Sequence, residues 1–457
     1  MSLTLYLLLF VAPLTVSADI AIDPETLHNV FGYPAPAQAA PVTPSNGTLV
    51  DLDYWDSGDD YTPASADYDK FDWTLTKRVA ATTNENFLLS PLGLKLALAI
   101  LTEAATGTTQ TELSSVLGFD LDRALVRRKF TVILESLQTR STRYILNLGN
   151  RIYVDDIAEP RQRFAAIAEK FYKTELTKID FNNASNAVRE INNWVANKTE
   201  GNILNLVNED DITGALVLVL NTLFFKGTWR HQFAPNATRT GAFYVAPNES
   251  KQVPFMRVRD KFYYTDSAKY DAKIVRLPYL GYKFAMYVIV PNSLTGLPRI
   301  LNSLSDLRAE LLYLEDHLVD VTLPKFKFDY TSLLDGILKE VRVHLTNSGQ
   351  PPQLGIRQAF EDTASFPGIA RGQSLHQRLR ISKVLQRSGI EVNELGSVAY
   401  SATEISLVNK FGEDSDDSQE VVANKPFLFF IQDEATRQLL FTGRVSDPSL
   451  VDGTLKL

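Results

Sequence analysis

The chain has 457 residues, 45% of them hydrophobic, and a formal net charge of -8 at pH 7. This length provides for one large domain or two ordinary ones with a sizeable core, and the acidic balance favours no nucleic-acid partner. The absence of cysteine excludes disulfide bonds, thiol catalysis and thiolate metal sites.

The N-terminus has the pattern of a secretory signal peptide. Residues 2–16 are almost all apolar and lead into Ser17, Ala18 and Asp19, which predicts a signal peptide of residues 1–18. The alternative is a membrane anchor, but the run is shorter than the ~20 residues that a spanning helix needs. No second apolar run approaches that length, so we expect a secreted, extracellular protein with no membrane segment.

Residues 19–72 are rich in Pro, Ala and Asp and lack periodicity, which predicts an acidic, disordered N-terminal arm before a folded domain at 73–450. Within the arm, Tyr54, Tyr61 and Tyr68 stand among aspartates. This segment either docks on a basic surface of a protease or is a solvated acidic tail.

The chain contains five N-glycosylation sequons, which fit passage through the secretory pathway, although such triplets also arise by chance. They predict a glycoprotein modified at Asn46, Asn183, Asn197, Asn236 and Asn248.

Helices dominate the first half of the predicted domain. Residues 88–101 are apolar on nearly every side, with Ser90 placed as N-cap and Pro91 in the first turn, so we expect a buried helix that is terminated by Gly107. Apolar periodicity predicts further helices at 111–117, 123–137, 161–172 and 188–198.

Strands dominate the second half. Residues 215–225 form a continuous β-prone apolar run, which is typical of a strand buried on both faces. Further strands are expected at 261–265, 273–278, 283–290 and 319–324, and a hairpin at 427–431 and 439–445. Helices first and strands later indicate a single α+β domain.

Little in the sequence suggests catalysis or metal binding. None of the five histidines lies in a His-Glu-x-x-His motif, and there is no Gly-x-Ser-x-Gly elbow and no glycine-rich phosphate loop. We therefore expect no enzyme activity, no metal and no cofactor. Scattered carboxylates leave an unrecognised hydrolase as an alternative.

Four motifs together resemble the serpin family of serine protease inhibitors, and the likeness covers about residues 71–448. In family order they are Asn86-Phe-Leu-Leu-Ser-Pro-Leu-Gly, Asn192-Asn-Trp-Val-Ala-Asn-Lys-Thr-Glu-Gly-Asn-Ile, Asn221-Thr-Leu-Phe-Phe-Lys-Gly-Thr-Trp, and Asn424-Lys-Pro-Phe-Leu-Phe-Phe-Ile with Phe441-Thr-Gly-Arg-Val-Ser-Asp-Pro.

The resemblance implies a serpin fold, with three β-sheets surrounded by about nine helices and an exposed reactive loop at 394–424. In such a fold a protease cuts the loop, and the freed segment inserts as an extra strand into the main sheet. The resemblance further implies a shutter of Ser90, Asn221 and Gln386, where Gln386 replaces the usual histidine. It also implies that Trp194 is the aromatic residue at the breach, where the loop enters the sheet.

The start of this loop is suited to insertion. Glu394 stands where the family has its hinge glutamate, and Gly396 suits a backbone that must change conformation. A strand period of two places small side chains on the inward face, at Ser397, Ala399, Ser401 and Thr403.

The family spacing from Glu394 places the scissile bond between Lys410 and Phe411. A lysine there suits a trypsin-like protease with an acidic pocket, whereas the alternative is an ordinary surface lysine. Residues 409–412 further resemble the loops of insect serpins that restrain the clip-domain proteases of prophenoloxidase activation and Toll signalling.

Two hypotheses follow. The first is a secreted, monomeric inhibitor that forms a covalent acyl complex with a trypsin-like clip-domain protease in a haemolymph-like fluid, and so restrains melanization and Toll-type immune or developmental cascades. The second is a non-inhibitory serpin-fold binding or carrier protein, suggested by the atypical Leu395, Val398 and Gln386.

One more surface is open to two interpretations. Arg123, Arg127, Arg128 and Lys129 fall on one predicted helix. They form either a binding site for a glycosaminoglycan or a solvated helix face.

Overall fold

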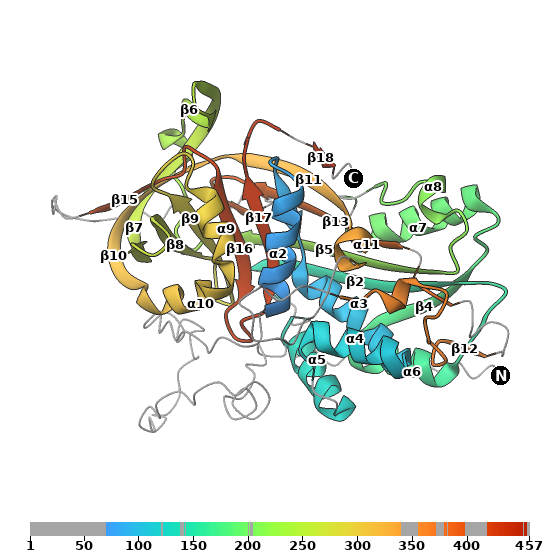
Figure 1. Ribbon diagram of the computed structural model, residues 1–457. Coiled ribbons are helices and arrows are strands. Elements are labelled where there is room, and N and C mark those ends of the chain that lie inside the picture. Colours follow the sequence, from blue (N-terminus) through green and yellow to red (C-terminus); the bar gives the residue numbers. More distant parts are fainter. Residues whose placement is uncertain are drawn as a thin grey trace, which may run out of the picture.

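The computed structural model describes residues 70–119, 122–137, 141, 143–199, 201, 204–339, 355–371, 379–381, 383–397, 418–450 and 452–454. Within these ranges the chain forms three sheets, of seven, nine and two strands, with helices packed around them (Figure 1). The predicted α+β class is confirmed.

The helices are α2 (Lys70–Thr82), α3 (Pro91–Ala104), α4 (Gly107–Leu117), α5 (Arg123–Leu137), α6 (Gln162–Tyr172), α7 (Ala184–Lys198), α8 (Glu209–Ile212), α9 (Leu297–Asn302), α10 (Leu307–Glu310) and α11 (Asp335–Lys339). Short 3-10 helices are η3 (Pro235–Ala237), η4 (Leu304–Asp306), η5 (Leu311–Tyr313) and η6 (Gln358–Phe360). Helix α2 begins at Lys70. It therefore extends across the predicted boundary between the N-terminal arm and the folded domain, which the composition placed at residue 73.

Helix α3 has the predicted N-terminus. The hydroxyl of Ser90 accepts a hydrogen bond from the amide of Gly93 at 3.3 Å, and Pro91 opens the helix. The expected end was wrong, because α3 stops at Ala104 and Gly107 begins α4 with a positive φ of 59°. Nearly every residue of α3 is buried, as its all-round apolar pattern predicted.

The seven-stranded sheet, called here the main sheet, has the strand order β18-β11-β13-β14-β5-β2-β4. Its strands are β2 (Tyr144–Asp155), β4 (Thr174–Ile179), β5 (Val217–Thr228), β11 (Phe326–Leu333), β13 (Lys383–Val392), β14 (Gly396–Ser397) and β18 (Asp452–Thr454). The central strands β13 and β5 run parallel, with Lys383–Ser388 opposite Leu218–Leu223.

The nine-stranded sheet contains the predicted C-terminal hairpin. Its strands are β1 (Phe87–Leu89), β6 (Arg239–Ala246), β7 (Glu249–Ser267), β8 (Ala272–Pro278), β9 (Phe284–Pro291), β10 (Glu315–Pro324), β15 (Gln419–Val422), β16 (Phe427–Asp433) and β17 (Leu439–Val445). The short strands β3 (Glu159–Pro160) and β12 (Ala370–Arg371) form the third sheet. The expected strand at 261–265 is only part of the much longer β7.

Two apolar clusters cover the two faces of the main sheet. Side chains alternate along a strand, so neighbours on β5 point to opposite faces. Val219 joins the larger cluster that contains α3, while Leu218 and Leu220 join the smaller one under α7. Figure 1 shows α7 and α8 on the opposite side of the main sheet from α4 and α6.

Candidate functional site

The hinge, residues 394–397, joins the main sheet at its C-terminal end. Its last two residues form β14, which is antiparallel to both neighbours. Ser397 is opposite Val392 on one side and Gly227 on the other, and Gly396 is opposite Thr228. Further along, β13 and β5 pair directly with each other. Among the described residues, two residues of the loop have therefore entered the end of the sheet, and β13 and β5 close the sheet from Ser388 and Leu223 onward.

Glycine is required at position 396 by space. A Cβ there would overlap the backbone carbonyl oxygen of Gly227 on β5. The turn into β14 is closed by the amide of Asn393, which donates to the carbonyl of Gly396 at 2.9 Å. The side-chain oxygen of Asn393 accepts from the amide of Leu395 at 3.0 Å. These contacts hold Gly396 against β5.

An aromatic pair holds the other side of the hinge. The buried hydroxyls of Ser397 and Tyr279 share a hydrogen bond of 2.7 Å. Tyr279 stacks on Trp229, with ring centroids 4.5 Å apart. The Trp229 indole donates to the carbonyl of Asn393, and the Trp229 amide donates to that of Leu395, both at 2.9 Å. Burial raises the pKa of Tyr279 far above its ordinary value, so its hydroxyl stays protonated.

Glu394 anchors the beginning of the hinge. Its carboxylate lies 2.9 Å from Lys325 Nζ and accepts a hydrogen bond from Thr238 Oγ1 at 2.7 Å. Its carbonyl accepts from the amide of Phe233 at 3.0 Å. Burial would raise the pKa of Glu394, but the bonds from Lys325 and Thr238 outweigh it and hold the pKa below its ordinary value.

The aromatic residue at this entry point is Trp229, so the prediction that Trp194 lies at the breach was wrong. Trp194 belongs to α7 and packs on the middle of the sheet, where Arg151 of β2 lies 4.8 Å from its ring. The error has a simple cause. Both tryptophans stand in the motifs that carry the family resemblance, and only the fold shows which one contacts the hinge.

The predicted shutter residues do lie together in the middle of the main sheet. The Gln386 side chain accepts from the Ser90 amide at 2.7 Å and donates to the Ser90 carbonyl at 2.8 Å. It also donates to Asn221 Oδ1 at 3.2 Å, and Asn221 in turn donates to Asn150 at 2.6 Å. Gln386 thus joins α3 to two strands without a titratable group of its own.

The first described part of the reactive loop ends at Ser397 in the main sheet, and the next described part leads into β15, which pairs in parallel with β10 of the nine-stranded sheet. Ala399, Ser401, Thr403, Lys410 and Phe411 lie outside the described residues. Both ends of the loop are described, and they belong to different sheets.

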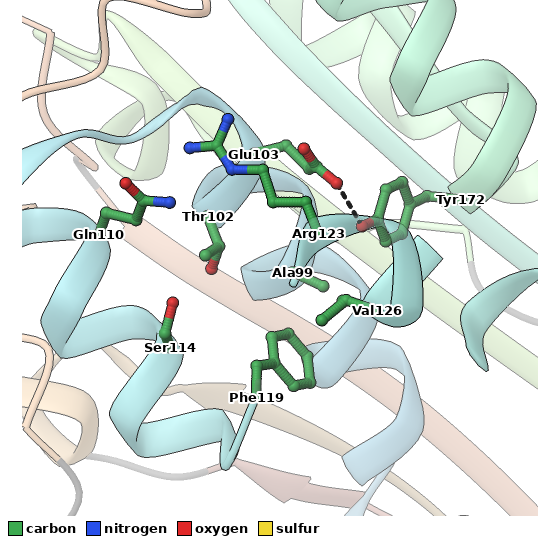
Figure 2. Close-up of a pocket in the computed structure, with 9 residues that line it drawn as sticks. All are labelled: Ala99, Thr102, Glu103, Gln110, Ser114, Phe119, Arg123, Val126 and Tyr172. Carbon is green, nitrogen blue, oxygen red and sulfur yellow. Dashed lines mark hydrogen bonds between the residues drawn. The ribbon is translucent and has the colours of Figure 1, made fainter. Parts of the chain in front are cut away.

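The four basic residues of α5 do not form one free surface. Arg127 makes a two-pronged ion pair with the buried Glu103, at 2.8 and 2.7 Å, and Tyr172 donates to Glu103 at 2.9 Å. Figure 2 shows Arg123 in the same cluster, beside a cavity of about 20 Å³. Arg127 therefore joins α5 to α3, and a glycosaminoglycan site remains a prediction for Arg123, Arg128 and Lys129.

Four of the five sequon asparagines fall in the described ranges and are exposed. Asn183 caps the N-terminus of α7, Asn197 lies near the end of that helix, Asn236 lies on η3, and Asn248 lies in the turn between β6 and β7. Asn46 lies outside the described residues, as do the predicted signal peptide and the acidic arm.

Two kinds of feature are absent from the part of the chain that the structure describes. No helix there is long and apolar enough to cross a membrane. The same residues contain no group of three or more His, Asp or Glu side chains placed to hold a metal ion.

Sequence reasoning missed three residues that contact the hinge, namely Thr238, Tyr279 and Lys325. Thr238 lies shortly after the motif that ends at Trp229, and this nearness in sequence was a usable signal. Tyr279 and Lys325 each follow a proline at a strand end, and nothing in that pattern indicates a contact with residues more than 60 positions away.

The fold and the inserted hinge define the class of protein. The family model described as "Serpin (serine protease inhibitor)" matches residues 66–448. The chain therefore belongs to the serpin family of serine protease inhibitors.

Its relatives include insect inhibitors. "Serine protease inhibitor 2" of Anopheles gambiae is 37% identical over 389 residues, which cover 83% of this chain and 91% of the relative. Serpin48 of the insect Tenebrio molitor, described as a highly specific serpin, has a TM-score of 0.73 at 28% identity and covers 88% of this chain and 100% of its own. Human thyroxine-binding globulin with bound thyroxine has a TM-score of 0.73 at 23% identity over 83% of this chain and 97% of its own, a likeness of fold alone.

Proposed function

We propose that this chain is a secreted suicide-substrate inhibitor of trypsin-like serine proteases, cut between Lys410 and Phe411. The observation that carries the proposal is the position of the hinge. Gly396 and Ser397 occupy the space between β13 and β5 where an inserted strand would begin.

Strand pairing supplies a reason for insertion to continue. β13 and β5 are parallel to each other, whereas β14 is antiparallel to both. Parallel pairing is slightly less stable per residue than antiparallel pairing. From Ser401, which the continued register places opposite Ser388 and Leu223, each residue that inserts would replace one parallel pairing by two antiparallel ones. This exchange of pairings favours growth of the strand.

The same register connects the hinge with the shutter. Continued from Ser397 opposite Gly227, it places Thr403 opposite Asn221. Asn221 and Gln386 are cross-strand neighbours and are hydrogen-bonded at present. Insertion must separate them, and the small side chain of Thr403 is suited to the space that opens.

The chemistry of the trap belongs to the protease. Its serine oxygen attacks the carbonyl carbon of Lys410, an ester bond forms, and the amine of Phe411 leaves with a proton. Insertion then carries the bound protease away from its starting position and distorts its active site, so water does not release the ester. The long cationic stem of Lys410 selects proteases with an acidic pocket.

The targets that fit best are the clip-domain proteases of insect prophenoloxidase and Toll-type cascades. The resemblance of residues 409–412 to the loops of insect serpins supports this, and so do the insect relatives. Secretion is part of the proposal, supported by the pattern of residues 1–18.

Incubation of the full-length protein with trypsin, followed by a denaturing gel, tests the proposal. We expect a covalent complex whose released fragment begins at Phe411. Lys410→Gln should abolish the complex, whereas Lys251→Gln, which changes an exposed lysine on β7, should leave it intact.

The same gel distinguishes the second candidate, a non-inhibitory binding or carrier protein. The thyroxine-binding globulin likeness shows that this fold also occurs in a protein that holds a ligand. Cleavage after Lys410 without any complex would favour the carrier function. A thermal melt of the cut chain adds a second measure, because insertion should raise its melting temperature.

A further inference from the structure

The last strand of the chain covers an edge of the main sheet. β18 pairs in parallel with β11, and residues 452–454 lie opposite residues 329–331. On its other side, β11 pairs with β13 along its whole length. Figure 1 shows β18 beside β11, close to the C-terminus. Without residues 452–454, β11 would therefore be the edge strand of the main sheet.

An uncovered β11 would be a good template for another strand. Its pairing with β13 runs through eight residue pairs with no shift of register, and the sequence from Phe326 to Leu333 contains no proline. Bulges, prolines and very short strands are the features that usually stop an edge from pairing with another chain. β11 has none of these three, whereas the three-residue β18 is itself a very short edge strand.

The charges of β11 favour a second copy of the same strand. Lys327 forms an ion pair with Glu391 of β13 at 2.8 Å. Asp329 forms one with Arg387 of β13 at 3.3 Å, so neither charge is left to repel an incoming strand. When two β11 strands pair antiparallel around a twofold axis at Phe328, each Lys327 lies opposite the Asp329 of the other copy. Opposite charges at facing positions stabilise a strand pair.

The segment that leads to β18 is tied down by Asn86. Its buried side chain accepts hydrogen bonds from the amides of Ser446 and Asp447, at 2.7 and 2.9 Å, and donates to the Asp447 carbonyl at 2.7 Å. The Asp447 carboxylate accepts from the amide and the hydroxyl of Ser449, at 2.9 and 2.6 Å. Residues 450 and 451 alone separate this turn from β18, so the cover is attached close to its place.

This attachment compensates for the small size of β18. Parallel pairing is slightly less stable per residue than antiparallel pairing, and β18 pairs in parallel over three residues only. A second copy of β11 pairs over more residues and in the antiparallel arrangement. A strand on a short linker, however, has an effective concentration on the order of mM, so a second copy at micromolar concentration does not displace it.

We propose that residues 452–454 keep this protein monomeric by covering β11, and that the uncovered edge binds β11 of a second copy. The resulting dimer is symmetric, and the two main sheets join into one continuous sheet. This interface goes beyond the proposed protease inhibition and does not depend on it.

The test compares the full-length chain with a chain that ends at Leu450. Light scattering after size-exclusion chromatography gives the mass of each over a series of micromolar concentrations. We expect the full-length chain to stay monomeric and the shortened chain to bind itself about 100-fold more tightly, since a tethered competitor has been removed. Hydrogen exchange of a peptide that covers residues 326–333 locates the contact. Its protection should rise with protein concentration in the shortened chain alone.

Two variants separate edge pairing from a loss of the fold. The first replaces both Asp452 and Gly453 by proline in the full-length chain. The N–H groups of neighbouring strand residues point to opposite sides, so this change removes the donor that faces β11 and should produce the same dimer. The second is Lys327→Glu in the shortened chain, which sets like charges opposite each other and should restore the monomer. Lys251→Glu, an exposed lysine of β7 that also pairs with a glutamate, is its control and should leave the dimer intact.

A shortened chain that stays monomeric over the same concentrations would overturn the inference. A dimer that survives Lys327→Glu, or that leaves the exchange of residues 326–333 unchanged, would overturn it as well, because the contact would then lie elsewhere. Thermal melts give the remaining outcome. If the shortened chain and the double proline variant both lose the folded state, residues 452–454 are needed for the fold itself, and their assignment as a cover is wrong.

Discussion

The hydrogen bond between Tyr279 and Ser397 makes the hinge position directly testable. Tyr279→Phe removes one hydroxyl and keeps the ring that stacks on Trp229. The Ser397 hydroxyl then remains fully buried with no other partner among the described residues. An unsatisfied buried hydroxyl costs about 1–3 kcal/mol. In a hinge released to solvent the same hydroxyl meets water, so the cost falls on the inserted position alone.

That cost corresponds to a factor of about 5–150 in the ratio of inserted to released hinge. Backbone hydrogen exchange of a peptide that covers residues 393–397 measures this ratio, because protection follows the free energy of local opening. We expect the protection to fall by the same factor. Tyr244→Phe, which changes a tyrosine of β6 that is 45% exposed, should leave it unchanged.

A double-mutant cycle sharpens the test. When both partners lose their hydroxyls, no buried group is left unsatisfied. Ser397→Ala in the Tyr279→Phe background should therefore restore part of the lost protection. Unchanged exchange in Tyr279→Phe, or no recovery in the double variant, would refute the assignment of this bond as a support of the inserted hinge.

Three further predictions concern charges and amides. The pKa of Glu394 lies below its ordinary value, so the contribution of its carboxylate to the stability of the inserted hinge is complete above about pH 4.3 and is lost as the pH falls further. The protection of the hinge amides from hydrogen exchange, corrected for the intrinsic exchange rate, should therefore drop below this pH in the wild type but not in Glu394→Gln. Arg127→Ala leaves the buried carboxylate of Glu103 without its ion-pair partner and should lower the free energy of unfolding in urea by about 3–5 kcal/mol. Arg128→Ala should change this free energy by less than about 0.5 kcal/mol. Gln386→Ala removes three buried hydrogen bonds and should cost about 1–3 kcal/mol in the same assay, while the exposed Gln252→Ala is its control.

Local patterns predicted much of the fold. The apolar run of α3, the Ser90 cap and the C-terminal hairpin depend on neighbouring residues, and all three were predicted correctly. Strands β2, β11 and β13 were missed. β13 carries polar or charged residues such as Lys383, Gln386 and Glu391, whose side chains are buried or paired in the fold. Its sequence therefore does not show the alternation of apolar and polar residues that is typical of a strand.

The site was predictable only where the resemblance assigned residues by motif. Ser90, Asn221 and Gln386 were found this way, and the structure brings them together. The two-residue insertion was not predictable, because it depends on the fit of Gly396 against Gly227, residues far apart in the sequence. The wrong choice of Trp194 over Trp229 has the same origin, since a motif names an aromatic residue but not its neighbours in space.

The attachment of the loop to two different sheets limits how far an uncut chain can go. Continued from Ser397 opposite Gly227, the register brings Ser406 opposite Leu218, about 30 Å along the sheet. Residues 407–418 must then return the whole way to β15 and, fully stretched, reach only about 40 Å. A return over about 30 Å would use most of this reach, so tension in the uncut loop would fall on the short edge strand β15, which pairs with β10 over Val319–Thr322. The number of residues after Ser406 thus limits how far the loop can insert before a protease cuts it.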